Sequence, residues 1–103
     1  MVTINWNWVP ERETTFWTDF TIADKFWTSA VRETFQRAFN EWKSNYKYLT
    51  ELVIVLNWKI WEHYEKWNKI LAKVYNDIWQ MADSYAYENL KDEELKYFIH
   101  NTD

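Results

Sequence analysis

The stretch that decides the fold is residues 60–85, IWEHYEKWNKILAKVYNDIWQMADSY. One set of its apolar residues recurs at alternating steps of four and three. This set is Ile60, Tyr64, Trp67, Leu71, Val74, Ile78, Met81 and Tyr85. Because residues three and four apart lie on the same side of an α-helix, this spacing predicts one helix with a single buried seam. The residues opposite predict a solvated face, and they are Lys59, Glu62, Lys66, Lys69, Lys73, Asn76, Gln80 and Asp83.

The seam extends backwards through the apolar run of residues 52–56. This run is rich in β-branched residues, so local propensity also allows a strand there. The phase continues through Val53 and Asn57, which favours one helix over residues 51–88 with Thr50 as its cap. A helix of about 38 residues would be about 57 Å long, whereas a domain of this size has a radius of gyration near 13 Å. We therefore expect this long helix to bend or break, or part of its seam to be covered by another molecule.

The N-terminal residues follow a different pattern. Over residues 2–9 apolar and polar side chains alternate, with Val2, Ile4, Trp6 and Trp8 on one side, which is typical of a half-buried strand or extended arm. Pro10 cannot donate a ladder hydrogen bond and marks the end of that segment. Residues 14–20 contain Thr, Phe and Trp and predict a second extended piece. Residues 1–20 are thus expected to form an extended arm or a β-hairpin.

Two further helices are predicted. Thr21 followed three residues later by Asp24 indicates an N-cap, and the apolar residues after it predict a helix over residues 21–44. Ser44 and Asn45 mark its end. Asn89 can cap a short helix over residues 90–100, with Asp92, Glu93 and Glu94 near its positive end. The fold class expected for residues 1–103 is one mainly α domain, a small helical bundle with one long helix and an N-terminal extended arm or hairpin.

The composition excludes several kinds of chemistry. The chain has no Gly and no Cys, so it lacks the glycines of phosphate-cradling loops and dinucleotide fingerprints, the cysteine nucleophile, and any disulfide. The longest purely apolar run is residues 52–56, far shorter than a membrane span. The first residues resemble no signal peptide. We expect a cytoplasmic protein that does not enter a membrane.

The charge is uneven along the chain. Six acids and two lysines lie from Asp83 to Asp103, so this segment carries the whole net charge of −4 and residues 1–82 are neutral. A basic footprint for nucleic acid is absent at this level. Lysines 59, 66, 69 and 73 could contact phosphates, but Glu62 and Glu65 interrupt them. Nucleic acid is therefore not the expected partner.

No motif indicates catalysis or metal binding. Glu62 directly precedes His63 and Glu65 follows two residues later, so the Glu-x-x-His pair of di-metal bundles is missing. His63 is expected to be a partly buried, hydrogen-bonded histidine. Neither His63 nor His100 has a serine in a local sequence that indicates an activated nucleophile. We expect no catalytic residue, no metal and no cofactor.

The nine tryptophans are the main functional signal. Trp67 lies on the seam and is expected in the core. Trp58 and Trp79 are 21 residues apart, which places them on one azimuth of the long helix outside the seam. Trp6 and Trp8 lie on the arm. Exposed tryptophan is favoured at binding interfaces, so these four residues and the acids Asp92, Glu93 and Glu94 are the candidate partner-binding residues, although each ring could also fold back into the core.

Several segments carry a resemblance to known proteins. They are residues 21–26 (TIADKF), 41–53 (EWKSNYKYLTELV), 56–65 (LNWKIWEHYE), 89–95 (NLKDEEL) and the closing residues 102–103. Together they resemble small proteins of unassigned function on integrative and conjugative elements of Gram-positive gut bacteria. Such proteins carry glycines near Trp27 and Asp92, which this chain lacks. The resemblance implies a mobile-element setting, in which small proteins often inhibit host defence nucleases or assist transfer.

These observations favour a non-catalytic protein-binding module of a mobile genetic element, of the anti-CRISPR kind. Its partner would be a protein such as a nucleic-acid enzyme, whose basic groove could meet the acids of residues 92–94, or a second copy of the chain. One alternative is a designed or structural helical protein with no partner beyond itself. A further alternative is a nucleic-acid-binding accessory protein of conjugation.

Overall fold

Five α-helices account for nearly all of the described chain. The computed structural model describes the backbone of residues 11–102 and the side chains of residues 15–102. The helices are α1 (Glu11–Asp24), α2 (Trp27–Trp42), α3 (Tyr46–Glu65), α4 (Lys69–Asn89) and α5 (Asp92–Thr102). The mainly helical fold class predicted from the sequence is confirmed, and no strand occurs among the described residues.

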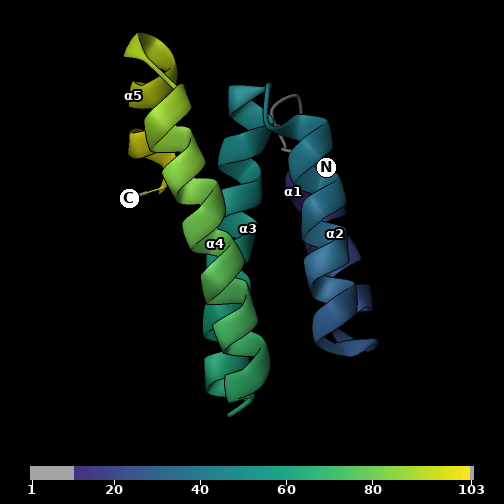
Figure 1. The fold of residues 1–103 in the computed structure, drawn as a ribbon. Coiled ribbons are helices and arrows are strands. Elements are labelled where there is room, and N and C mark those ends of the chain that lie inside the picture. The colour runs from purple at the N-terminus through teal and green to yellow at the C-terminus, as the bar shows by residue number, and fades with distance from the viewer. Residues whose placement is uncertain (1–10, 103) are drawn as a thin grey trace, which may run out of the picture.

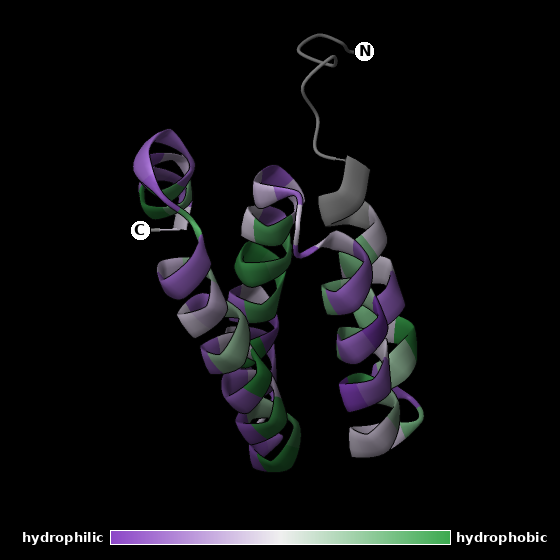
Figure 2. Cartoon of the chain, turned by 45° about the horizontal axis from the view of Figure 1, so that its top comes forward, coloured by the Kyte–Doolittle hydropathy of each residue, from purple (hydrophilic) through white to green (hydrophobic). Residues whose placement is uncertain are grey.

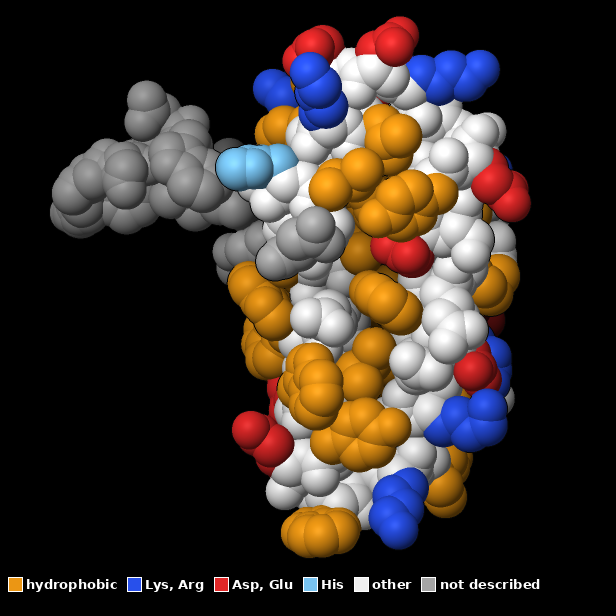
Figure 3. Space-filling view, turned by 90° about the vertical axis from the view of Figure 1, so that its left-hand side faces the viewer, with side chains coloured by type: hydrophobic (Ala, Val, Ile, Leu, Met, Phe, Trp, Pro, Cys, Tyr) orange, Lys and Arg blue, Asp and Glu red, His pale blue; other side chains and the backbone are white. Residues whose placement is uncertain are grey.

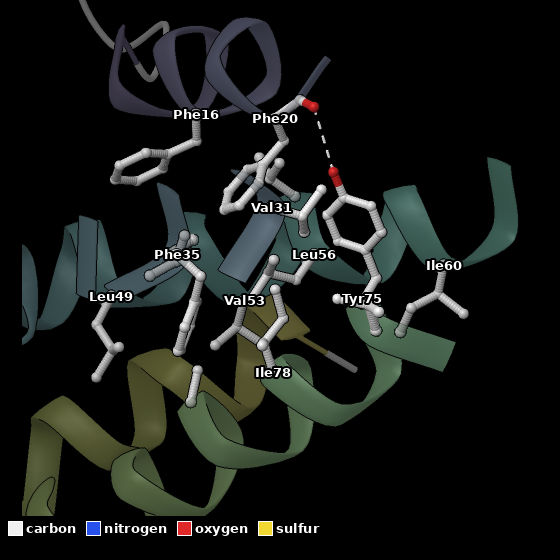
Figure 4. Close-up of a cluster of buried hydrophobic side chains, with 14 of the residues drawn as sticks. Phe16, Phe20, Val31, Phe35, Leu49, Val53, Leu56, Ile60, Tyr75 and Ile78 are labelled. Carbon is white, nitrogen blue, oxygen red and sulfur yellow. Dashed lines mark hydrogen bonds between the residues drawn. The ribbon is translucent and has the colours of Figure 1, made fainter. Parts of the chain in front are cut away.

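The helices form two antiparallel hairpins that lie side by side, with α5 packed across one end (Figure 1). One hairpin is α1–α2 and the other is α3–α4; α1 contacts α3, and α2 contacts α4. The core lies between the hairpins. Phe16 and Phe20 of α1 point towards side chains of α2, α3 and α4, among them Val53, Leu56 and Ile78 (Figure 4).

α1 replaces part of the predicted arm. Residues 14–20, expected to be extended, are helical, so that prediction is wrong. The reason is tertiary: Phe16, Phe20 and Ala23 recur at steps of four and three, and all three are buried against the core. This burial outweighs the weak β-propensity of the segment. The arm predicted at residues 2–9, and the first half of the hairpin that it would form, lie outside the described residues.

The predicted helix over residues 21–44 is in fact two elements. Thr21 lies inside α1 rather than capping a helix, and the chain reverses at residues 25–26. There the backbone N–H groups of Lys25 and Phe26 donate to the carbonyl oxygens of Ile22 and Ala23, at 3.1 and 2.9 Å. These tight bonds end α1, and Trp27 begins α2 with φ of 78°.

The next helix begins earlier than predicted. Ser44 and Asn45 do mark a break, and the Asn45 side chain accepts hydrogen bonds from the backbone N–H groups of Lys47 and Tyr48. Thr50 is therefore not the cap; it lies inside α3, where its hydroxyl donates to the carbonyl oxygen of Tyr46 at 2.7 Å. Residues 52–56 are helical, as the seam predicted. Figure 2 shows strongly hydrophobic colouring in the upper part of α3, the helix in the middle of that view.

The long helix breaks at residues 66–68, which was one of the outcomes expected from its length. Trp67 has φ of 59° and Asn68 caps α4 by accepting from the backbone N–H of Leu71 at 3.2 Å. The two halves then fold against each other, within a molecule whose radius of gyration is 13.8 Å. Helix α3, at 1.5 Å per residue, is only about 30 Å long. None of the described helices has the combination of length and apolarity that crossing a bilayer requires.

The break changes the seam. Ile60, Leu71, Val74 and Ile78 are buried as predicted. Trp67, expected in the core, has 81% of its surface exposed, and Tyr64 and Met81 are also exposed, so the seam does not run through them. The turn at residues 66–68 accounts for Trp67, whereas within α3 and α4 the buried face runs through the neighbouring residues His63 and Ala82 in place of Tyr64 and Met81. Lys59, expected on the solvated face, is completely buried.

The short C-terminal helix is displaced by two residues. Asn89 does not cap it, because Asn89 is the last residue of α4 and its amide donates to the carbonyl oxygen of Tyr85 at 2.9 Å. Helix α5 begins at Asp92, with all three acids of residues 92–94 in its first turn, as expected. Phe98 is its fully buried residue and attaches it to α3 and α4.

Candidate functional site

The C-terminal half of α3 and the turn after it form an exposed aromatic surface, made of Trp58, Trp61, Tyr64 and Trp67. Their exposed fractions are 46, 60, 50 and 81%. Trp58 packs edge-on against Trp17 of α1, with ring centroids 6.2 Å apart, and Trp61 lies 5.8 Å from the Tyr64 ring. These rings are supported from one side and open to solvent on the other.

The sequence of α3 explains this exposure. Its inner side carries aliphatic residues such as Leu52, Leu56 and Ile60, which fill the core. Its outer side in the second half carries tryptophans where a solvated helix usually carries charged residues. Seen from the side on which α4 and α5 lie in Figure 1, the apolar side chains of the molecule gather in a strip along its length (Figure 3). Large exposed apolar surfaces of this kind mark interaction sites.

The other predicted binding residues lie apart from this surface. Trp79 is on α4, partly buried and packed against the core, so it no longer shares an azimuth with Trp58 on one helix. Asp92, Glu93 and Glu94 are exposed on α5, at the end of the molecule opposite the α3–α4 turn (Figure 1). Trp6 and Trp8 lie outside the described residues. Of the predicted set, the aromatic surface therefore contains only Trp58.

A buried polar cluster lies between α1, α3 and α4, and sequence reasoning missed it. Lys59 has no exposed surface, and its ammonium nitrogen lies 2.8 Å from Asp24 Oδ2 and 3.3 Å from Glu62 Oε2. It also donates to Thr21 Oγ1 at 3.2 Å. The same nitrogen lies 4.5 Å from the centroid of the Trp17 ring, a cation–π contact.

His63 and Tyr75 complete the cluster. His63 Nε2 lies 3.0 Å from Asp24 Oδ2, and the His63 ring stacks on the Tyr75 ring at 5.3 Å. The Tyr75 hydroxyl donates to Asp24 Oδ1 and to the backbone carbonyl oxygen of Phe20. Burial raises the pKa of the Tyr75 hydroxyl far above its usual range, and the hydrogen bond to Asp24 and the negative charges of Asp24 and Glu62 raise it further. His63 was expected to be partly buried and hydrogen-bonded; the hydrogen bond is confirmed, the side chain is more deeply buried than expected, and its Nδ1 has no hydrogen-bond partner among the described residues.

This cluster has atoms of the kind that bind a metal ion, but they are already engaged by another cation. Asp24, Glu62 and His63 each have one potential ligand atom, and the three atoms lie within 4.8 Å of one another. However, the Lys59 ammonium contacts both carboxylates, so the position between them is already taken by a cation. These residues therefore do not fit a metal ion. The arrangement is typical of an internal ion-pair network that ties one helix to another.

The side chains of Lys59, His63 and Tyr75 lie away from the hollows found on the described surface. Three of these hollows lie between α1 and α2, between α2 and α4, and beside α5. None of these three hollows is lined by Lys59, His63 or Tyr75. A general acid or base must reach its substrate within hydrogen-bond distance, and Lys59 has no exposed surface through which it could do so.

Comparisons with protein-family models, with curated proteins and with solved structures found no match to this chain.

Proposed function

We propose that this protein is a non-catalytic protein-binding module that acts through the aromatic surface of Trp58, Trp61, Tyr64 and Trp67. The observation that carries the proposal is the exposure of these four rings, each about half or more, on one half of one helix and the turn after it. Aromatic residues, tryptophan above all, contribute most of the energy at protein interfaces. Their rings lose little conformational entropy on binding, because they have only two rotatable side-chain bonds.

The mobile-element setting implied by the sequence favours a host defence nuclease as a partner, which this protein would inhibit by blocking it. The acids of residues 92–94 support such a partner, because they are exposed and could face a basic groove. They lie at the opposite end of the molecule from the aromatic surface. A partner that contacts both must therefore extend along the whole molecule, and a net charge of −4 suits steric blocking better than imitation of a DNA duplex.

The charges of the described surface argue against nucleic acid as the partner. Lys66 pairs with Glu62 at 3.4 Å, and Lys73 pairs with Asp77 at 3.4 Å. Lys59, which the sequence placed in the same basic strip, is buried. A strip that is interrupted and already paired releases few counterions from a phosphate backbone.

The test is capture of a partner from a bacterial lysate that contains defence nucleases, followed by a cleavage assay with the captured nuclease in purified form. The double variant Trp58→Ala/Trp61→Ala should bind the partner at least about 30-fold more weakly, the effect of losing about 2 kcal/mol of interface energy. Circular dichroism should remain helical. The control is Phe26→Ala, because Phe26 is 70% exposed but lies in the α1–α2 turn.

Comparing Phe26→Ala with the double variant shows whether the aromatic surface is the binding site. If Phe26→Ala reduces capture as much as the double variant does, the aromatic surface is not the binding site. If the captured nuclease cleaves DNA equally well with and without the protein, the inhibitor role is wrong even though binding is real. A wild-type protein that captures no nuclease contradicts the proposed partner class.

A further inference from the structure

A regular stripe of six residues runs along the outer face of α3. Its members are spaced by steps of four, three, four, three and four, and they are Lys47, Glu51, Ile54, Trp58, Trp61 and Glu65. This is the spacing that keeps residues on one side of a helix. None of the six is buried. Helix α3 therefore has two apolar sides, one in the core and this outer stripe, which carries Trp58 and Trp61 of the aromatic surface.

The spacing of the outer stripe is the same whether it is followed from the N-terminal or the C-terminal end of the helix. Its spacing is symmetric about Leu56, which lies midway between Lys47 and Glu65. If two copies of α3 are placed antiparallel about this midpoint, Lys47 lies opposite Glu65 of the second copy, and Ile54 lies opposite Trp58 of the second copy. Each end of the stripe then carries an ion pair, Glu51 lies opposite Trp61 of the second copy, and Ile54 and Trp58 form an apolar centre, as in a self-complementary two-fold interface.

The charges at the two ends are arranged unfavourably within one molecule. Lys47 lies in the first turn of α3, near the positive end of the helix dipole, and Glu65 is the last residue of α3, near the negative end. Among the described residues neither side chain forms an ion pair. In an antiparallel pair, each charge would lie beside the opposite end of the second helix, where its sign is favourable.

From these observations we propose that the outer stripe of α3 binds the same stripe of a second copy, antiparallel, about a two-fold axis that crosses the outer side of the helix at the level of Leu56. The proposal rests on the proposed function in using Trp58 and Trp61 of the aromatic surface, so a second copy and a nuclease would compete for these two rings. The stripe runs over 19 residues, from Lys47 to Glu65, or about 27 Å of helix. Both ion pairs form at the rim of this contact and set its direction, while the tryptophans in the middle supply most of the affinity.

The experiment uses two charge reversals in the full-length chain, Lys47→Glu and Glu65→Lys, with self-association measured by sedimentation equilibrium. In a homodimer of either variant, like charges meet at both ends, so the dissociation constant should rise at least about tenfold. When the two variants are mixed, every contact at the ends joins a Glu to a Lys. The mixture should form heterodimers with about the affinity of the wild type, which native mass spectrometry detects by mass. The double variant Lys47→Glu/Glu65→Lys should also dimerise.

Restoration on mixing supports this interface and no other, because neither an unfolded variant nor a different contact face would regain affinity in the mixture. A wild-type protein that stays monomeric at its highest soluble concentration overturns the proposal. So does a dimer whose affinity is unchanged in both single variants, or a mixture no tighter than its components. A monomer that still captures a nuclease through Trp58 and Trp61 would leave the proposed function standing, whereas a dimer that captures none would refute only the proposed function.

Discussion

Positive φ angles are found at three of the described residues, and in this glycine-free chain they fall on Trp27, Trp67 and Asp92. Each of the three lies where one helix has ended and the next begins. A residue with a Cβ in the left-handed region costs roughly 1–2 kcal/mol, so each turn stores some strain.

The turn at Trp67 gives a direct test of this strain. Trp67→Gly should raise the free energy of unfolding by ~0.5–1 kcal/mol, because glycine accepts φ of 59° without a steric clash. The ring is 81% exposed, so little packing is lost. Thermal unfolding followed by circular dichroism is the measurement, and 1 kcal/mol corresponds to about 4–8 °C in Tm for a domain of this size.

The matched control is Gln80→Gly, at an exposed position inside α4. The same new residue should there lower stability by about 1 kcal/mol relative to a good helix former. The opposite signs separate a local backbone effect from a general effect of glycine. A Trp67→Gly protein that melts below the wild type would show that the tryptophan ring, and not the backbone, stabilises the turn.

At the scale of elements, the hydrophobic period was the reliable signal. It predicted a helix through residues 52–56 against their β-propensity, and it identified Leu71, Val74 and Ile78 as core residues. It could not show where the chain reverses. The breaks at residues 25–26 and 66–68 lack Gly and Pro, and the turn at residues 25–26 lies beside Asp24, whose partners Lys59, His63 and Tyr75 are far away in sequence.

The candidate site was predictable only in part for the same reason. Trp58 was recognised as exposed because it lies off the seam. Trp67 was not, because the seam was assumed to continue through one uninterrupted helix, and Trp61, which also lies off the seam, was not singled out. Lys59 stands at the same spacing from the seam residues as lysines that are solvated. It is buried only because α1 packs against it. The periodicity of a single sequence does not show where α1 packs.

Two residues of the predicted seam, both on α4, test which face of this helix is buried. Leu71→Ala should cost ~2–5 kcal/mol, since Leu71 is 2% exposed and its truncation leaves a cavity. Met81→Ala removes a similar volume from the same predicted seam, but Met81 is 54% exposed and the change should stay within about 0.5 kcal/mol. Chemical denaturation of both variants measures the difference. Equal losses would mean that α4 keeps the uninterrupted seam.

At the scale of the whole molecule, one carboxylate joins three helices. Asp24 is on α1, and it binds Lys59 and His63 on α3 and Tyr75 on α4. The hairpin α1–α2 is thus tied to the hairpin α3–α4 by polar contacts as well as by Phe16 and Phe20. The ion pair also fixes the rotation of α1 about its axis, because only one rotation aims Asp24 at a lysine with no exposed surface.

Removing this carboxylate should therefore destabilise the entire bundle and not only the end of α1. Asp24→Ala leaves the ammonium of Lys59 buried with Glu62 as its one remaining ionic partner, and breaking a buried pair from one side costs ~3–5 kcal/mol. Domains of this size have only ~5–15 kcal/mol of stability in total. Urea denaturation followed by tryptophan fluorescence and by circular dichroism should show one transition, displaced to lower urea by both probes.

Asp19→Ala is the matched control, since Asp19 lies on the same helix and is exposed, and it should cost no more than about 0.5 kcal/mol. A loss of similar size in both variants would show that the network contributes nothing beyond helix propensity. If an early partial transition preceded the main one, α1 would be unfolding separately and Asp24 would not be joining the two hairpins into one cooperative unit.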